Sequence, residues 1–289
     1  MSVEFLSRKV LNNILEYEKL NYICTGYEEL DNMIGGFVEG NLYVLAGRAS
    51  MGLTTFALNV INEIAVKNKQ PVLYFSLSES YAQLARRLIA IACYNKYSDI
   101  EKVSSQYSIS PKKAMDGIVE QISNSKVCII DGFSRSIDTF EEMLRENNDV
   151  WRVKFVIVDS LELMKEYDLR NPEKNRTVLE KIKNIAKDLN IAILLLSHYS
   201  NRVEYRPNKR PMVSDLVGLS NIEEYVGNIW FMYRDDYYNE FSDYEGKAEI
   251  IIARSNHGTT GMAHIPFDNC AKWTNYVVGR DREVYDEQP

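Results

Sequence analysis

Residues 42–55 read LYVLAGRASMGLTT, an apolar run followed at once by a glycine-rich turn. The run Leu42–Ala46 is apolar at every position, which is typical of a strand buried on both faces. After the turn, Thr54 and Thr55 open a stretch with helical spacing that reaches Val66. A strand, a glycine-rich turn and a helix in immediate succession are the first parts of a βαβ unit. This stretch therefore predicts an α/β protein built on a parallel sheet.

The same alternation continues along most of the chain. Further apolar runs, each expected to be a buried strand, lie at 72–76, 127–131, 155–159 and 191–197. Segments with helical spacing lie between them, at 81–94, 137–145 and 176–189. Later apolar segments indicate edge strands at 228–233, 248–253 and 262–267. We therefore expect a mostly parallel sheet with helices on both faces and antiparallel strands at one edge.

The composition is that of a soluble globular protein. The chain has 289 residues, of which 45% are hydrophobic and 26% are charged, and its net charge is −7. A surface that coats nucleic acid is usually basic, so this charge disfavours such a role. Neither a signal peptide nor a membrane-spanning run is evident, and we expect a cytoplasmic protein without membrane contact. The widely spaced cysteines predict reduced core residues rather than disulfides or a zinc site: Cys24, Cys93, Cys128 and Cys270.

Residues 1–20 precede the domain that we assign to 21–289. Apolar residues recur in this arm at helical spacing, at Phe5, Val10, Leu11, Ile14 and Leu15. The spacing predicts a short amphipathic helix, comparable to a linker. Two interpretations remain open: the helix packs on its own domain, or it docks on a neighbouring subunit.

The glycine-rich turn has the spacing of a phosphate loop, G-x-x-x-x-G-K-[ST], with Leu53 at the lysine position. In such loops backbone N–H groups surround the phosphates, the lysine reaches the β and γ oxygens, and the following hydroxyl binds magnesium. Leucine supplies no charge. If ATP or ADP with Mg²⁺ binds, the residues of the loop expected to contact it are Gly47, Arg48, Ser50, Gly52, Thr54 and Thr55. Of these, Thr54 is the expected magnesium ligand; the alternative is that no cofactor binds.

From residue 25 onward the chain resembles the C-terminal ATPase domain of DnaB-type replicative helicases. The entry Thr25-Gly26-Tyr27 with Leu30-Asp31 and Gly35-Gly36 is shared more loosely with other RecA-like proteins. More particular to DnaB are Ser50-Met51-Gly52, Phe75-Ser76-Leu77, residues 158–164 (VDSLELM), Lys209-Arg210-Pro211 with Ser214-Asp215-Leu216, and Tyr233-Arg234-Asp235. The resemblance implies a RecA-like P-loop NTPase core.

The resemblance also implies a position for each catalytic group, and most of these positions carry another residue. The glutamate that polarises water follows Phe-Ser-Leu in the helicases; here that position is Ser78, and Glu79 comes one residue later. A shift of one residue at a strand end points a side chain elsewhere, which disfavours Glu79 as a replacement base. Arg48 is the one basic residue within the loop, but the helicases carry an arginine there together with the lysine.

The resemblance places the Walker B acid at Asp159, which is then expected to contact the nucleotide and to be a magnesium ligand with Thr54; a turn-capping carboxylate is the alternative interpretation. The sensor glutamine is replaced by His198, which is either a phosphate donor or a structural residue at a strand end. The helicases carry a lysine and, two positions later, an arginine finger; here these positions are Arg254 and Asn256. An arginine finger contributes roughly 10³ to 10⁵ in rate, and asparagine supplies no such charge.

The loop that contacts DNA in the helicases is altered as well. Where they usually read Asp-Leu-Arg-Glu-Ser-Gly, residues 215–220 read DLVGLS, so the arginine that grips the DNA backbone is Val217. Four basic residues remain upstream: Arg202, Arg206, Lys209 and Arg210. They form either a residual contact loop for single-stranded DNA or a solvated face.

Four catalytic groups of the helicases are replaced together in this chain: the lysine, the glutamate, the glutamine and the arginine finger. In the helicases their positions converge on one phosphate. This favours a catalytically silent relative of the helicase that acts by binding a helicase ring or another replication protein, or by forming a ring of its own. Weak or absent binding to single-stranded DNA is expected. The rival hypothesis is a weak ATPase or helicase that uses Thr54, Asp159, Glu79 and Arg254 in altered geometry. A third is a module that binds nucleotide or single-stranded DNA without turnover.

Overall fold

The computed structural model describes residues 22–97, 103, 109–216, 218–219 and 221–267. Its main sheet has eight strands in the order β10-β9-β8-β3-β7-β6-β4-β5. All neighbours from β8 to β5 pair in parallel, and β9 and β10 are added antiparallel at the β8 edge. The strands are β3 (Leu42–Gly47), β4 (Val72–Ser76), β5 (Val127–Ile130), β6 (Phe155–Asp159), β7 (Ala192–His198), β8 (Asn228–Tyr233), β9 (Lys247–Arg254) and β10 (Gly261–Pro266). The predicted fold class is confirmed.

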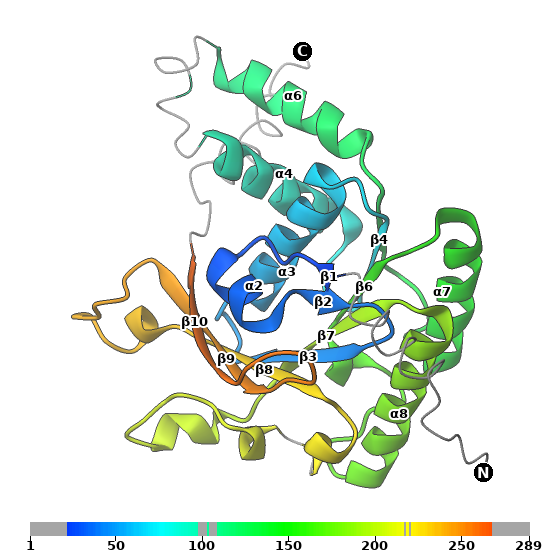
Figure 1. Ribbon diagram of the computed structural model, residues 1–289, viewed down its shortest axis with the longest axis vertical. Coiled ribbons are helices and arrows are strands. Elements are labelled where there is room, and N and C mark those ends of the chain that lie inside the picture. Colours follow the sequence, from blue (N-terminus) through cyan, green and yellow to red (C-terminus); the bar gives the residue numbers. More distant parts are fainter. Residues whose placement is uncertain (1–21, 98–102, 104–108, 217, 220, 268–289) are drawn as a thin grey trace, which may run out of the picture.

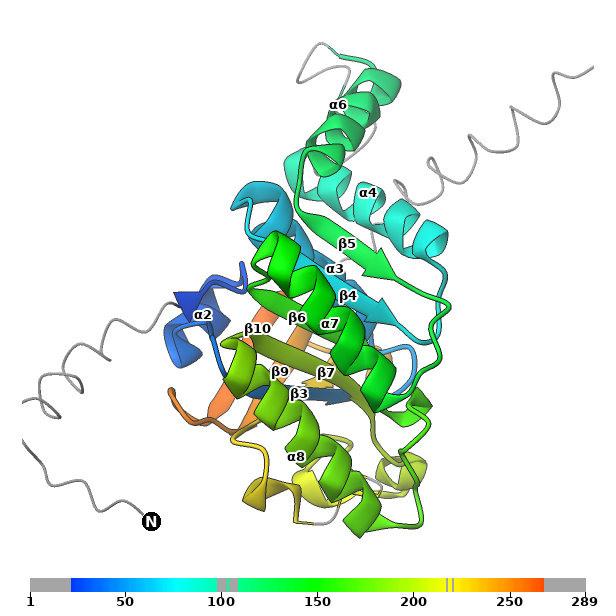
Figure 2. The same ribbon diagram turned by 90° about the vertical axis from the view of Figure 1, so that its right-hand side faces the viewer.

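Helices cover both faces of this sheet (Figure 1). The α-helices are α2 (Glu28–Ile34), α3 (Leu53–Ile61), α4 (Tyr81–Tyr97), α6 (Pro111–Ser123), α7 (Ile137–Trp151) and α8 (Pro172–Leu189). Helix α3 continues as a π-helical segment, Asn62–Lys67. Short 3-10 helices span Leu161–Leu163, Asn201–Tyr205, Val213–Asp215, Ile222–Glu224 and Asp235–Tyr237. Figure 2 shows α7 and α8 lying side by side over one face of the sheet.

The alternation of side chains along β3 explains the two layers of core. Tyr43 and Leu45 pack with α2, α3 and α4 in one buried cluster. Leu42 and Val44 point to the other face and pack with α7 and α8 in a second cluster. Because successive strand residues point to opposite faces, a strand that is apolar at every position must be covered on both sides.

The helix ends follow local capping chemistry more closely than hydrophobic spacing. Spacing places the start of α8 at Arg176, but the helix begins four residues earlier, at Pro172. The Asn171 side chain accepts the Lys174 N–H (3.0 Å), and proline fits the first helical position, where no N–H partner is needed. The helix ends at Leu189, and the left-handed conformation of the following residue, Asn190, is typical of a helix stop.

Asp31 on α2 explains the entry motif at Thr25, Gly26 and Asp31. Its carboxylate accepts the backbone N–H of Thr25 (2.9 Å) and of Gly26 (3.2 Å), which ties the chain before α2 to the helix itself. Strands β1 (Tyr22–Ile23) and β2 (Phe37–Val38) flank this helix and pair antiparallel as a small separate sheet. The motif therefore fixes how the chain enters the main sheet.

The arm at the start of the chain and one of the four cysteines lie outside the part that the structure describes. The arm at 1–20, with its two docking interpretations, and Cys270 lie outside the described residues. Cys93 is buried as expected and Cys128 is partly buried, but Cys24 is exposed, because it precedes the Thr25 turn rather than lying within the core. Within the described ranges, no helix combines the length and apolarity needed to cross a bilayer.

Candidate functional site

The backbone of a phosphate loop joins β3 to α3. Gly47 ends the strand and Leu53 begins the helix. Between them Ser50 (φ 69°) and Gly52 (φ 101°) adopt the left-handed region, and the Met51 N–H donates to the Arg48 carbonyl (3.1 Å). Such a turn at the start of a helix directs backbone N–H groups into one concave surface that suits an anion. The loop geometry is therefore retained.

The lysine position in this loop is filled by hydrocarbon. Leu53 is 5% exposed, and its side chain folds back over the first glycine of the loop. A methyl group added to Gly47 would lie 2.9 Å from Leu53 Cδ2. The leucine therefore packs against the strand end where a lysine would extend toward phosphate, and it supplies no charge to stabilise a departing γ-phosphate.

Arg48 does not replace the missing lysine in this arrangement. Its Nη1 donates to the Tyr237 hydroxyl (2.7 Å), and its Nε lies 2.8 Å from a Glu204 carboxylate oxygen. Both partners come from loops that follow β7 and β8, and the guanidinium also lies over the Tyr237 ring, 5.2 Å from its centroid. The charge of Arg48 is thus paired within the protein.

The magnesium position is held together by three side chains. Asp159 ends β6, is 5% exposed, and accepts the Thr54 hydroxyl on Oδ2 at 2.8 Å. The same oxygen accepts the Tyr74 hydroxyl at 2.6 Å. A hydroxyl beside a carboxylate is the pair that holds magnesium and its waters in phosphate-loop proteins. The carboxylate thus faces the loop instead of capping a turn. Sequence reasoning identified Thr54 and Asp159 but not Tyr74.

The position of the water-polarising base carries no free carboxylate. Ser78 is exposed at the end of β4. Glu79 lies 2.7 Å from Arg87 Nη1, and Arg87 Nη2 donates to Thr55 Oγ1 (3.0 Å). Ser78 and Glu79 both line a cavity of about 380 Å³ at the carboxyl ends of β4 and β5. Because the Glu79 carboxylate is already paired with Arg87, it is not free to contact an attacking water.

His198 at the sensor position is held by a partly buried acid, Glu162, that sequence reasoning missed. Glu162 accepts the His198 backbone N–H (2.7 Å) and the Ser197 hydroxyl, and it lies 3.4 Å from His198 Nδ1. The hydrogen bond with Glu162 raises the pKa of His198, and the charges of Glu162 and Asp159 add to this effect against partial burial. Burial alone would raise the pKa of Glu162, but the bonds from His198 and Ser197 outweigh it and lower that pKa.

Asn256, the residue at the finger position, packs against its own chain. The Asn256 backbone N–H donates to Asn228 Oδ1 (3.0 Å), and a methyl group added to Gly227 would lie 1.9 Å from Asn256 Nδ2. The asparagine therefore lies against the start of β8. Arg254 is exposed at the end of β9, and no side-chain partner for it is found among the described residues.

Three of the four upstream basic residues form hydrogen bonds or ion pairs within the protein. Arg206 forms two bonds with Asp215 (2.8 and 3.2 Å), and Lys209 donates to the Glu204 carbonyl. Arg210 forms two bonds with Glu249 (2.6 and 2.7 Å), which is 1% exposed. Arg202 is exposed and its side chain is the member of this set for which the described residues offer no partner. In the loop that corresponds to the DNA loop of the helicases, Val217 and Ser220 lie outside the described residues.

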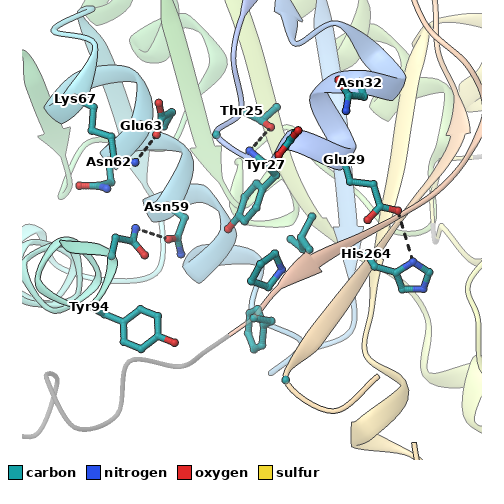
Figure 3. A pocket seen from close by; sticks show the side chains of 17 residues that line it. Thr25, Tyr27, Glu29, Asn32, Asn59, Asn62, Glu63, Lys67, Tyr94 and His264 are labelled. Atoms are coloured by element: carbon teal, nitrogen blue, oxygen red, sulfur yellow. Dashed lines mark hydrogen bonds and ion pairs between the residues drawn. The ribbon is translucent and has the colours of Figure 1, made fainter. Parts of the chain in front are cut away.

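A larger cavity of about 710 Å³ lies next to the loop but does not include it (Figure 3). Figure 3 shows side chains from α2, α3, α4 and β10 around this space, among them Tyr27, Asn59, Tyr94 and His264. Phe267 links the cavity to the loop, because a methyl group added to Gly52 would lie 2.3 Å from its ring. None of residues 47–55 lines the cavity itself.

The residues at the loop fit one part of a Mg·ATP site. Thr54 and Asp159 have the chemistry and proximity of magnesium ligands. Among the described residues near the loop, Leu53 is apolar, and Arg48 and Arg87 are paired with Glu204 and Glu79. These three side chains therefore offer no unpaired charge to a phosphate group.

Comparisons with known proteins identify the fold and the family. The sequence model of the DnaB-like helicase C terminal domain matches residues 23–275. The replicative DNA helicase DnaB of Buchnera aphidicola (strain Bp) is 33% identical over 276 residues, which cover 90% of this chain and 57% of that protein. The DnaB of Geobacillus stearothermophilus is 30% identical over 271 residues, which cover 92% and 58%.

Solved structures agree with this relationship. The ATPase domain of G40P superimposes with a TM-score of 0.80 at 26% identity and covers 95% of this chain and 98% of that domain. A DnaB-like replicative helicase studied with primase gives a TM-score of 0.79 at 26% identity, covering 92% and 66%. The chain spans between 57% and 63% of the length of the helicases that it matches first. Over residues 23–275 the chain belongs to the DnaB-like helicase C-terminal domain family.

Proposed function

We propose that this chain is a DnaB-like replication protein that has lost efficient ATP hydrolysis and acts by binding a helicase ring or another replication protein. The observation that carries the proposal is the buried Leu53, which packs against Gly47 in the place of the phosphate-binding lysine. Removal of that cation alone deprives the γ-phosphate of its main positive partner within the loop.

Three further positions support the same conclusion. Ser78 replaces the base, and Glu79 beside it is paired with Arg87. Asn256 replaces the finger and lies against its own β8, so it does not extend toward a neighbouring subunit. A single substitution can be compensated by a nearby group, but cation, base and finger act on the same phosphate from different elements. Their joint replacement leaves little to drive the reaction.

A protein partner is favoured over bare DNA. The net charge is −7, and three of the four basic side chains near the altered DNA loop are bonded internally. Single-strand binding depends on cations that are free to contact phosphates. DnaB-type helicases assemble as rings through contacts between domains of this fold, and one structural relative was solved for its interactions with primase. A helicase ring, a ring of this chain itself, or a primase-like replication protein are therefore the partners to test.

The experiment for turnover compares phosphate release by the wild-type chain with that of Asp159→Asn, with and without single-stranded DNA. Because Asp159→Asn removes the magnesium-binding carboxylate, it reports the background of the preparation. We expect the two proteins to release phosphate at the same rate. DNA-stimulated release by the wild type alone would contradict the proposal.

The experiment for partner binding mixes the chain with the replicative helicase of its own cell and follows co-elution by size exclusion. The mixture is run at low and at moderately high salt, because an acidic chain can associate non-specifically through charge alone. We expect co-elution that persists at the higher salt. Separate elution of both proteins in both buffers, without a ring of the chain itself, would exclude these partners.

A second candidate function is nucleotide binding without turnover. The retained Thr54–Asp159 pair and the loop backbone favour it. A ligand that binds the native state raises the melting temperature by mass action. A clear rise with Mg·ATP in wild type and a smaller rise in Asp159→Asn would establish this function; equal melting curves with and without nucleotide would exclude it.

A further inference from the structure

The Asp159 carboxylate is satisfied from within the protein. It is 5% exposed, and a buried carboxylate is costly unless hydrogen bonds or a metal compensate its charge. Thr54 and Tyr74 donate to the same oxygen, Oδ2, at 2.8 and 2.6 Å. Two short hydrogen bonds from hydroxyls to one carboxylate oxygen offset much of the buried negative charge that a cation would offset in a magnesium site.

Tyr74 reaches Asp159 across neighbouring strands. It lies in β4, which pairs in parallel with β6, so that Tyr74 stands opposite Ile157 and Ser76 stands opposite Asp159. The phenol ring is fully buried in the core beneath α3 and α4. From this position the phenol hydroxyl donates to the Asp159 carboxylate.

We propose that Tyr74 is a positioning residue that stands in for the divalent cation: its hydroxyl holds Asp159 in place without metal and lowers the affinity of the site for Mg²⁺. A magnesium ion at Thr54 and Asp159 would have to take the Thr54 oxygen as a ligand and share a carboxylate already bonded to Tyr74. The site is in this way stable in its metal-free form. The inference concerns metal binding only and stands whether or not a helicase partner exists.

The test measures the melting temperature of Tyr74→Phe with EDTA and with excess MgCl₂, in the absence of nucleotide. The matched control is Tyr43→Phe, which also removes a buried hydroxyl, but one whose bond is with the Val38 backbone N–H and not with a carboxylate. With EDTA, we expect Tyr74→Phe to melt about 3–9 °C below wild type, because it leaves a buried charge with one donor fewer. Mg²⁺ should then recover several degrees in Tyr74→Phe and leave wild type and Tyr43→Phe almost unchanged.

A merely structural role for Tyr74 would lower the melting temperature without changing the response to Mg²⁺. A magnesium response of Tyr74→Phe no larger than that of wild type would therefore overturn the proposal. If the variant does not fold, calorimetric titration of the wild type with MgCl₂ decides: binding weaker than millimolar supports the proposal, and binding tighter than that contradicts it. In Tyr74→Phe, the further change Asp159→Asn should abolish the gained response, which assigns it to this carboxylate.

Discussion

Restoring the lysine of the phosphate loop should not restore ATP hydrolysis. Leu53→Lys returns the cation to the loop, but the base position remains Ser78 and the finger position remains Asn256. Glu79 cannot compensate because Arg87 holds it at 2.7 Å, and Asn256 lies against Gly227 of its own subunit. We therefore expect turnover to remain far below that of a working helicase.

The size of the remaining deficit follows from the two missing groups. A missing finger costs roughly 10³ to 10⁵ in rate, or about 4 to 7 kcal/mol of barrier. A missing general base costs about 10² to 10⁴. The two losses in rate do not multiply fully when the residues act as a unit. We therefore use only the lower end of the finger effect, a loss of about 10³ in rate. Relative to a typical enzyme at about 10 s⁻¹, Leu53→Lys should turn over at no more than about 10⁻² s⁻¹.

The assay is continuous phosphate release at saturating Mg·ATP, with and without single-stranded DNA. Leu53→Lys/Asp159→Asn gives the background, and melting curves confirm that each variant is folded. A combined variant, Leu53→Lys/Ser78→Glu/His198→Gln/Asn256→Arg, replaces all four groups and should exceed Leu53→Lys by at least about 10². DNA-stimulated turnover near 1 s⁻¹ in Leu53→Lys alone would refute the reasoning that these groups are jointly required.

Three further predictions concern stability and DNA binding. Arg210→Met leaves the carboxylate of Glu249, which is 1% exposed, without its partner. The substitution should lower the free energy of unfolding by about 3 kcal/mol in urea titrations. An unchanged urea midpoint would show that the Arg210–Glu249 ion pair does not stabilise the fold. Since the His198 pKa is raised, its bond to Glu162 stabilises fully below the unfolded value of 6.5 and less as pH rises through the folded value. The difference in melting temperature between wild type and His198→Gln should accordingly shrink as the pH rises, and a constant difference would speak against this. Of the four upstream basic residues, Arg202 alone is expected to contact a DNA phosphate. A plot of log K for single-stranded DNA against the logarithm of the salt concentration should therefore have a slope no steeper than about −1, whereas a slope of −3 would show several phosphate contacts.

The fold was predictable because its signals are local. Runs that are apolar at every position, such as Leu42–Ala46, require cover on both faces, and the glycines of residues 47–52 allow the turn that a phosphate loop needs. The boundaries were less accurate where capping outweighs spacing, as at Asn171 and Pro172, which start α8 before its first apolar residue. The position of Thr54 followed from the spacing of the phosphate loop, whereas that of Asp159 came from the resemblance to the helicases.

The contacts that decide the chemistry of the site were not predictable, because their partners are distant in the sequence. Glu162 meets His198 across 36 residues, and Tyr74 meets Asp159 across 85. The basic cluster gave no sign that Arg210 would bond to Glu249, since only the packing of β9 beside that loop brings them together. Sequence patterns show which groups are missing from a site, whereas the structure shows which remaining groups are already paired.

The rate of phosphate release by the purified wild-type chain tests the account most directly, at saturating Mg·ATP and with single-stranded DNA present. With Leu53 buried on Gly47 and Glu79 bound to Arg87, we expect a rate equal to that of Asp159→Asn. A rate near 1 s⁻¹ that depends on DNA and disappears in Asp159→Asn would contradict it.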